Sequence, residues 1–155
     1  MPERKIKPFT PAQERLGNVV VRIMSTLNVV LFRLSKGRVG GRFLRGAPVL
    51  LLTTTGRKSG ERRTAPVLYL ADGDRFVVVA SKGGFSTHPL WYKNLESNPN
   101  VEVELKGEQK KMMAKRASDV EKRLLWPKLV AMYRDFDDYQ ARTQREIPVV
   151  ILSPR

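Results

Sequence analysis

The hydrophobic positions divide the chain into one long helical segment followed by a series of short strands. Between residues 16 and 34 the apolar residues recur at intervals of three and four, the period of an amphipathic helix. They are Leu16, Val19, Val20, Ile23, Leu27, Val30, Leu31 and Leu34. Thr10 and Gln13 form a capping box around Pro11, and Gly37 is a natural stop. We therefore predict a flexible arm over residues 1–10 and a helix over 11–36 with one buried face.

The remaining apolar segments are shorter and indicate β-strands. We expect strands at 48–55, 65–70, 75–80, 101–105, 109–116 and 147–152. Asp72-Gly73 suits a tight hairpin turn between two of them, and Pro148 suggests an edge or strand-start position. Pro89 opens a short helix, and a second capping box, Ser118 with Glu121, opens a longer one. This order predicts the α+β class, with a small, mostly antiparallel barrel or sandwich and flanking helices in a single domain over 11–155.

Composition removes several kinds of chemistry. Cysteine is absent, which excludes disulfides, thiolate nucleophiles and cysteine-based metal sites. His88 is the only histidine, so neither a usual zinc ligand set nor a serine triad can be assembled, and we expect no metal. The apolar stretch 19–34 is shorter than the roughly 20 residues of a bilayer span and contains Arg22 and Arg33. We therefore expect a cytoplasmic protein without a transmembrane helix or signal sequence.

Charge points to an anionic partner. The 29 Lys and Arg residues outnumber 15 Asp and Glu, which gives a net charge of +14 and attraction for nucleic acid, acidic lipid or an anionic small molecule. Hydroxyls, glycines and four cations crowd into residues 53–64. Arginine, lysine and turn amides together suit phosphodiester and carboxylate groups. The spacing of Gly56 and Gly60 is too short for a Walker loop, and a solvated basic hairpin is the alternative interpretation.

Two further segments carry candidate chemistry. The run from Ser81 to Gly84 places a lysine and exposed backbone donors at the end of a predicted strand, where a plain flexible connection is the alternative. Tyr133, Phe136 and Tyr139 recur every three residues, so a helix would present them as an aromatic wall with two phenols. Core packing alone would also explain that spacing.

Four ordered segments, residues 50–60, 80–84, 88–95 and 139–143, resemble those of the deazaflavin (coenzyme F420)-dependent nitroreductase and quinone reductase family. The resemblance covers nearly the whole chain and implies the split β-barrel fold of FMN-binding proteins. It also implies reduced coenzyme F420 as cofactor, with its phosphodiester and glutamate tail at the cationic turn and its deazaflavin near Ser81. The predicted activity is hydride transfer to a quinone, enone or nitro compound, followed by protonation from a phenol or water.

The resemblance assigns roles to individual residues. The implied cofactor-binding residues are Thr53, Arg57, Lys58, Ser59, Gly60, Arg62, Arg63, Thr64, Pro66, Ala80, Ser81, Lys82, Gly83, Gly84, Trp91, Asn94 and Phe136. The implied catalytic residues are Tyr133, Tyr139 and Ser81. Relatives often have tyrosine at the position of Phe136 and two residues after Pro66, where this chain has Leu68. These two departures leave the acceptor range, including nitroimidazoles, open.

Other functions stay possible at this level. The split barrel also accepts FMN or haem, because a fold does not fix a function. A basic nucleic-acid-binding module is a second alternative, against which the acidic residues Glu102 to Glu108 count. The helix over 10–34 also suits peripheral attachment to the inner face of the cell membrane, where it would meet lipid-soluble quinones, or pairing between subunits.

Overall fold

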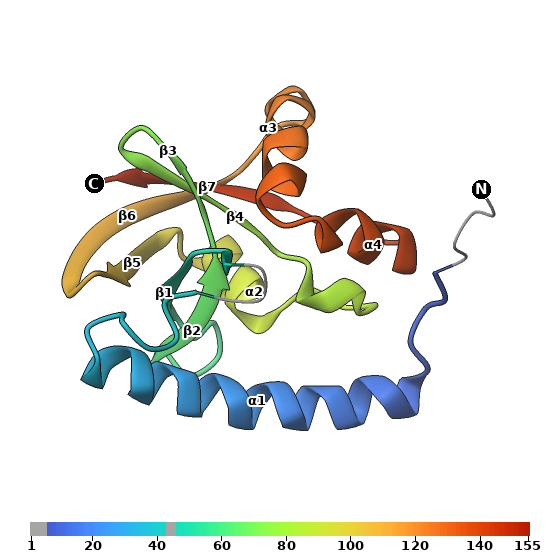
Figure 1. The fold of residues 1–155 in the computed structure, drawn as a ribbon, viewed down its shortest axis with the longest axis horizontal. Helices are drawn as coiled ribbons and strands as arrows, with labels where there is room; N and C mark the ends of the chain where they lie inside the picture. Colours follow the sequence, from blue (N-terminus) through green and yellow to red (C-terminus); the bar gives the residue numbers. More distant parts are fainter. Residues whose placement is uncertain (1–5, 43–45) are drawn as a thin grey trace.

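The computed structural model describes residues 6–42 and 46–155. Within them the chain forms four α-helices, one short 3-10 helix and seven strands (Figure 1). The helices are α1 (Pro11–Leu34), η2 (Lys82–Gly84), α2 (Leu90–Ser97), α3 (Asp119–Met132) and α4 (Asp135–Arg142). The strands are β1 (Val49–Thr55), β2 (Arg62–Leu68), β3 (Leu70–Asp72), β4 (Arg75–Val79), β5 (Asn100–Leu105), β6 (Glu108–Arg116) and β7 (Val149–Pro154).

All seven strands belong to one antiparallel sheet with the order β2-β1-β5-β6-β7-β4-β3. The single strand expected at 65–70 is in fact two, β2 and β3, which follow one another in the chain but lie at opposite ends of this order. The chain passes between them at Tyr69, whose N–H donates to the carbonyl of Pro48 at 3.1 Å. Because β2 also contacts β4, the sheet curls into a half-barrel, which confirms the predicted barrel.

The core fills both faces of this curved sheet. Alternate residues of a strand point to opposite faces, and in β4 and β7 both sets are buried. Phe76, Val78, Val150 and Leu152 belong to an inner cluster closed by Tyr92 of α2. The intervening residues of both strands belong to an outer cluster under α3 and α4. The last strand is therefore interior to the sheet, and Pro148 marks its start rather than an edge.

Both predicted capping boxes are present, at Thr10 with Gln13 and at Ser118 with Glu121. The aromatic segment differs from the prediction, because Tyr133, Phe136 and Tyr139 do not share one helix. Tyr133 caps α3 in an extended conformation, with φ −145° and ψ 101°, and α4 begins at Asp135. A spacing of three residues fits one continuous helix and two successive helices equally well. The pattern therefore could not show that the helix is broken between Met132 and Asp135.

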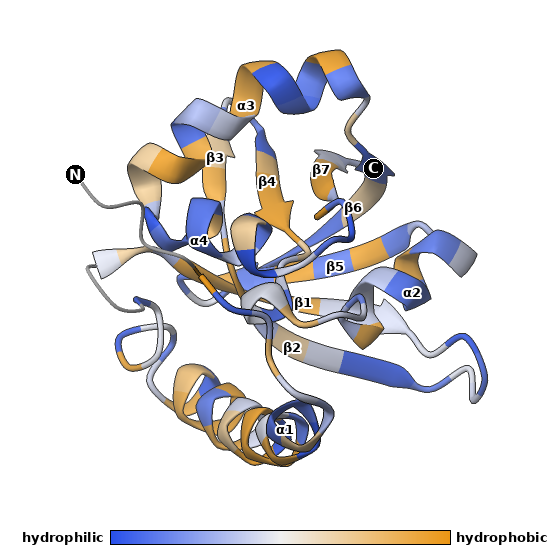
Figure 2. Ribbon diagram, turned by 90° about the vertical axis from the view of Figure 1, so that its right-hand side faces the viewer, coloured by the Kyte–Doolittle hydropathy of each residue, from blue (hydrophilic) through white to orange (hydrophobic). Residues whose placement is uncertain are grey.

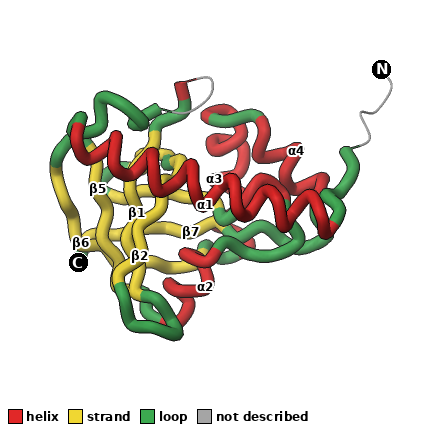
Figure 3. Tube along the Cα trace, turned by 90° about the horizontal axis from the view of Figure 1, so that it is seen from below, coloured by secondary structure: helices red, strands yellow, loops and turns green. Residues whose placement is uncertain are grey.

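Helix α1 departs furthest from the expectation. It lies along one side of the half-barrel and contacts β2 (Figures 1 and 3), but Phe32 is its only buried residue. The predicted stripe faces away from the core: Leu16 is 68% exposed, Ile23 62% and Leu27 53%. Figure 2 shows apolar residues around the helix on the side away from the sheet. The prediction of an apolar face buried in the domain core is therefore wrong, because periodicity shows that a helix has an apolar face but not what covers it.

The length argument against a membrane span is also wrong. Helix α1 has 24 residues and is long and apolar enough to cross a membrane by length and composition.

Candidate functional site

The cationic turn, residues 56–61, links β1 to β2 and is held by its own backbone and by α2. The N–H of Gly56 donates to the carbonyl of Glu61 at 2.7 Å, and the N–H of Gly60 donates to the carbonyl of Gly56 at 2.8 Å. The side chain of Asn94 accepts from the Arg57 N–H at 3.2 Å and donates to the Thr54 hydroxyl at 3.1 Å. Asn94 is buried, and its two hydrogen bonds fix the start of the turn against α2. We call this segment the Arg57 turn.

The four predicted cations differ in whether they have a carboxylate partner. Arg62 and Arg63 are successive residues of β2 and point to opposite faces. Arg62 pairs with Glu102, and Arg63 pairs with Glu61 at 2.9 Å, so each has a carboxylate partner. Arg57 and Lys58 are exposed, and neither joins a salt bridge among the described residues. The free positive charge of the turn therefore lies at these two side chains.

On the Arg62 face, a small cavity of about 130 Å³ opens between β1, β2 and β5. Its lining includes Thr53, Arg62, Glu102 and Arg155. Thr53 and Thr64 share a hydrogen bond of 2.8 Å between their hydroxyls. Of the predicted cofactor-binding residues, Thr53 and Arg62 are thus brought to one place and Arg57 and Lys58 to another, at the two sides of one hairpin.

The second predicted segment, residues 80–85, which we call the Ser81 loop, contains the hydrogen-bonded 3-10 turn η2. Lys82, Gly83 and Gly84 all have positive φ angles, of 46°, 62° and 82°. The N–H of Gly84 donates to the carbonyl of Ser81 at 2.9 Å. Lys82 is half-buried and donates to the Thr87 hydroxyl at 3.3 Å, and burial lowers the pKa of its ammonium group.

Helix α4 packs directly against the Ser81 loop. Arg142 donates to the carbonyl of Gly83 at 2.8 Å. A Cβ on Gly84 would lie 2.7 Å from the carbonyl oxygen of Tyr139, so glycine alone permits this approach. The sequence-predicted phenol segment and the sequence-predicted loop are therefore neighbours in the structure.

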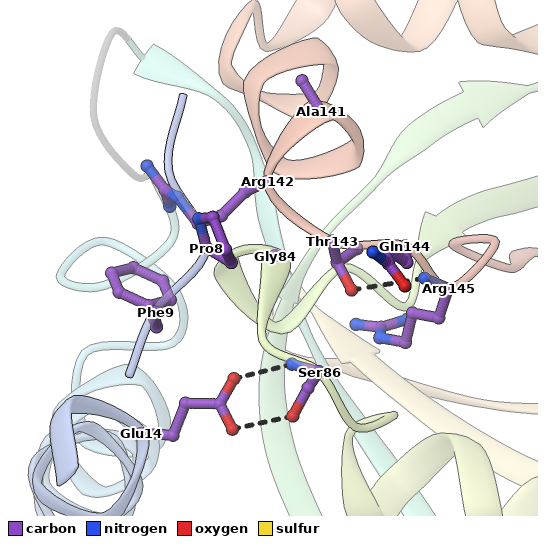
Figure 4. A pocket seen from close by; sticks show the side chains of 10 residues that line it. All are labelled: Pro8, Phe9, Glu14, Gly84, Ser86, Ala141, Arg142, Thr143, Gln144 and Arg145. Carbon is purple, nitrogen blue, oxygen red and sulfur yellow. Dashed lines mark hydrogen bonds between the residues drawn. The ribbon is translucent and has the colours of Figure 1, made fainter. Parts of the chain in front are cut away.

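Beside this contact lies the larger cavity, of about 520 Å³ (Figure 4). We call it the α4 cavity; its lining residues are Pro8, Phe9, Glu14, Gly84, Ser86, Ala141, Arg142, Thr143, Gln144 and Arg145. Figure 4 shows Glu14 reaching from the first turn of α1 to Ser86, whose N–H and hydroxyl each donate to the carboxylate at 2.8 Å. These two bonds are the main reason that the pKa of Glu14 is lowered. Phe9, expected in a flexible arm, contacts Phe85 edge-on at 5.0 Å between ring centroids.

The two predicted phenols form a pair. The hydroxyls of Tyr133 and Tyr139 are 3.0 Å apart. Tyr133 is 2% exposed and belongs to the outer core, whereas Tyr139 is only partly buried. Burial, followed by the bond to Tyr139, raises the pKa of Tyr133. Phe136 is buried between the two tyrosines and Trp126, so its ring is a support for the phenols.

Several residues of this region escaped the sequence analysis. They are Phe9, Glu14, Ser86, Arg142 and Arg145, all of which line the α4 cavity. Arg142 lies in the family-like segment 139–143 and Glu14 in the predicted helix 11–36, but neither was singled out, because no local pattern marks such residues as parts of a site. Over residues 6–42 and 46–155 no group of three or more His, Asp or Glu residues is arranged to hold a metal ion.

Comparison with known proteins decides the family. Residues 24–154 match the family described as F420H(2)-dependent quinone reductase. The chain belongs to this family. The F420H(2)-dependent quinone reductase Rv1261c of Mycobacterium tuberculosis is 39% identical over 132 residues, which cover 83% of this chain and 89% of that protein. Rv3178 of the same organism, which carries the same family description, is 42% identical over 118 residues, or 76% of this chain and 99% of that one.

Solved structures agree with this assignment. An F420-H2 dependent reductase (FDR-A) superposes with a TM-score of 0.64 at 36% identity and covers 68% of this chain and 94% of its own. A chain solved as a domain-swapped dimer has a TM-score of 0.66 at 32% identity, with 83% and 97% covered. The haem storage protein HutZ of Vibrio cholerae, at 15% identity and a TM-score of 0.52, shares the fold alone. The chain is thus an F420-dependent reductase of split-barrel fold that uses the reduced coenzyme.

The residues present suit that coenzyme. A cofactor with an anionic tail and a planar ring needs positive charge without carboxylate partners at one end, which Arg57 and Lys58 supply. It needs an ordered loop with backbone donors at the other, which the Ser81 loop supplies. Asn94 and the rest of α2 connect the two places through hydrogen bonds and packing.

Proposed function

We propose that the protein reduces a quinone at the Ser81 loop, with enones and nitro compounds as further acceptors. The observation that carries the proposal is the packing of α4 on this loop, with the carbonyl of Tyr139 close to the Cα of Gly84. It places a phenol-bearing helix beside the loop that the resemblance assigns to the deazaflavin. When bound, the reduced coenzyme supplies a hydride; the chain supplies binding, orientation and a proton.

The anionic tail of the coenzyme is proposed to bind at the Arg57 turn. Arg57 grips a phosphodiester or carboxylate through two N–H groups, while Lys58 adds a point charge. Ser59 and Gly60, which form the exposed tip, allow close approach of a ligand to the backbone. Arg62 and Arg63 contribute less, because each already has a carboxylate partner.

Tyr139 is proposed to protonate the reduced acceptor. Its hydroxyl bonds to that of Tyr133, which burial keeps protonated, so the pair has a reserve proton behind the partly buried phenol of Tyr139. Ser81 and Lys82 are proposed to orient the coenzyme ring. Reduction of the quinone then takes one hydride and one proton and gives the hydroquinone.

The test is direct turnover. Purified protein is mixed with reduced F420 and menadione, and the return of the oxidised coenzyme's absorbance is followed. We expect turnover that saturates with both reactants. An absence of turnover above background with several quinones would refute the proposed acceptor class, and titration with FMN and haem would then show whether another cofactor binds.

We propose in addition that α1 attaches the protein to an anionic membrane surface. The helix presents exposed apolar residues along its length, and the exposed Arg15 and Arg22 accompany them on a chain of net charge +14, whereas Arg33 pairs with Glu104 at 3.2 Å. Apolar insertion and attraction to anionic lipid act together in such helices. Surface attachment would bring the α4 cavity, which the first turn of α1 lines through Glu14, close to lipid-soluble quinones.

Flotation with vesicles separates the possibilities. The wild type should float with vesicles that contain phosphatidylglycerol, and substitution of Val20 and Leu27, both about half exposed, by glutamate should abolish it. The control replaces the exposed Arg123 and Lys128 of α3 by alanine, which lowers the net charge by two, as the two glutamates do. A protein that stays unbound, or a stable dimer that the same α1 substitutions dissociate, would overturn membrane attachment and assign α1 to a contact between subunits.

A further inference from the structure

Arg145 makes an unusually complete set of contacts with the Ser81 loop. Its Nε donates to the carbonyl of Phe85 at 2.8 Å, and its Nη2 donates to the carbonyl of Ser81 at 2.7 Å. Its Nη1 reaches the carbonyl of Ala80 at 3.2 Å and Nδ1 of His88 at 3.0 Å. One guanidinium group therefore holds both ends of a six-residue loop.

The loop has a shape that needs such support. Lys82 has a φ of 46°, a left-handed backbone conformation that residues other than glycine rarely adopt. Three carbonyls of the loop point toward Arg145, and the carbonyl of Gly83 accepts from Arg142. Without these donors the carbonyls of Ala80, Gly83 and Phe85 would lose these hydrogen bonds, and the carbonyl of Ser81 would keep the bond from the N–H of Gly84, so the loop would favour other conformations.

The charge of Arg145 also lies where an anionic cofactor benefits from it. The side chain is half-buried, and among the described residues it forms no salt bridge. Burial lowers its pKa and Glu14 raises it, but a guanidinium stays protonated in proteins. The loop is thus backed by a permanent positive charge, which carbonyl dipoles, the acceptor nitrogen of His88 and the more distant carboxylate of Glu14 stabilise.

The backbone of Arg145 is itself fixed to α4. The side chain of Gln140 donates to the Arg145 carbonyl at 2.9 Å and accepts from the N–H of Ile147 at 2.9 Å. Gln140 follows Tyr139 directly. Arg145 therefore joins the helix that carries the proposed proton donor to the loop that receives the coenzyme, in one hydrogen-bonded unit.

We propose that Arg145 is a positioning residue, which fixes the Ser81 loop in its coenzyme-binding shape and sets Tyr139 in register with it. The role rests on the proposed function of the loop and is separate from the tail-binding role of the Arg57 turn. Lysine cannot replace arginine here, because an ammonium group lacks the planar fork that reaches several carbonyls together.

The test compares Arg145→Lys with Arg123→Lys, an exposed control on α3. In the coenzyme-free protein, amide hydrogen exchange at Gly83, Gly84 and Phe85 should be faster in Arg145→Lys alone. The dissociation constant of F420, measured by its fluorescence, should rise on the order of tenfold, since small misplacements in a site have such effects. The KM for menadione should change less than the KM for the reduced coenzyme.

Unchanged loop exchange together with an unchanged F420 dissociation constant would overturn the proposal. A lower melting temperature with an unchanged dissociation constant would overturn it too, and would assign Arg145 a purely structural role. If the variant does not fold, the wild type still decides: its Arg145 Nε–H should exchange more slowly than that of Arg123, and equal rates would refute the proposal. If wild-type protein binds no F420, the proposed function fails, while the loop exchange still tests the positioning.

Discussion

At the scale of single residues, the tyrosine pair shows how position divides two similar groups. Tyr133 and Tyr139 share a hydrogen bond, but Tyr133 lies in the outer core and Tyr139 does not. The sequence did not distinguish the two tyrosines as candidate proton donors. Tyr139 is the more exposed of the two, which is why we propose it as the group that contacts the acceptor.

Replacement of the two phenols by phenylalanine should therefore have unequal effects. Tyr139→Phe should lower the rate of hydroquinone formation by about 10²-fold, the usual contribution of a positioned proton donor. Tyr133→Phe should lower it less, because it removes only the reserve proton. Single-turnover kinetics with reduced F420 and menadione measures both; equal losses in the two variants would contradict this division.

His88 gives the protein a single titration near neutral pH. Burial, and then the charge of Arg145, lower its pKa below the ordinary value of 6.5. The folded state therefore prefers neutral His88, which can accept the hydrogen bond from Arg145. The resulting stability is complete above pH 6.5 and is lost as the pH falls through the lowered pKa of the folded state.

We expect the melting temperature of the wild type to fall between pH 7 and pH 5 relative to that of His88→Asn. Asparagine offers an acceptor for Arg145 but does not titrate in this range. The difference between the two melting curves isolates His88, since every carboxylate is common to both. Curves that stay parallel over this interval would show that His88 titrates alike in folded and unfolded chains.

At the scale of elements, the contact between α4 and η2 depends on glycine. Gly84 and Gly60 both have positive φ angles, of 82° and 71°, but only Gly84 has backbone at the position of a Cβ. Gly60 has nothing within 4 Å of that position. Alanine substitution at Gly60 therefore measures the free-energy cost of the backbone conformation alone. The same substitution at Gly84 adds the cost of a clash with α4.

Gly60→Ala should reduce the free energy of unfolding by about 1–2 kcal/mol, from backbone strain alone. Gly84→Ala should reduce it further, by about 1–3 kcal/mol more, because the carbonyl of Tyr139 cannot move aside without shifting α4. Urea denaturation monitored by tryptophan fluorescence gives both values. Equal losses would mean that α4 adapts freely to the loop.

The Arg57 turn makes a second prediction at this scale. Arg57→Ala with Lys58→Ala should weaken F420 binding by about tenfold or more, since both cations lack carboxylate partners among the described residues. Arg63→Ala should have a smaller effect, because Glu61 already balances its charge. Fluorescence titration, with Arg123→Ala plus Lys128→Ala as the control, tests the order. An unchanged affinity in the first variant would place the tail of the coenzyme elsewhere.

At the scale of the whole molecule, net charge should govern how fast the coenzyme binds. A chain of charge +14 attracts an anionic ligand over distances set by ionic strength. The screening length falls from about 30 Å at 0.01 M salt to about 3 Å at 1 M. Stopped-flow association of F420 should therefore slow steeply with added salt, while dissociation changes less. A rate independent of salt would show that local contacts alone guide binding.

The chain pattern by itself determined most of the strands, both capping boxes, the hairpin at Asp72-Gly73 and the family segments, because periodicity, caps and turns are local properties. It could not show that residues 65–70 cross between the two ends of the sheet, nor that α1 leaves its apolar face outside the core. It also could not find Arg145, whose partners lie 57 to 65 positions away in the chain. Tertiary structure decided these features, because strand partners, buried faces and converging hydrogen bonds depend on residues that only folding brings together.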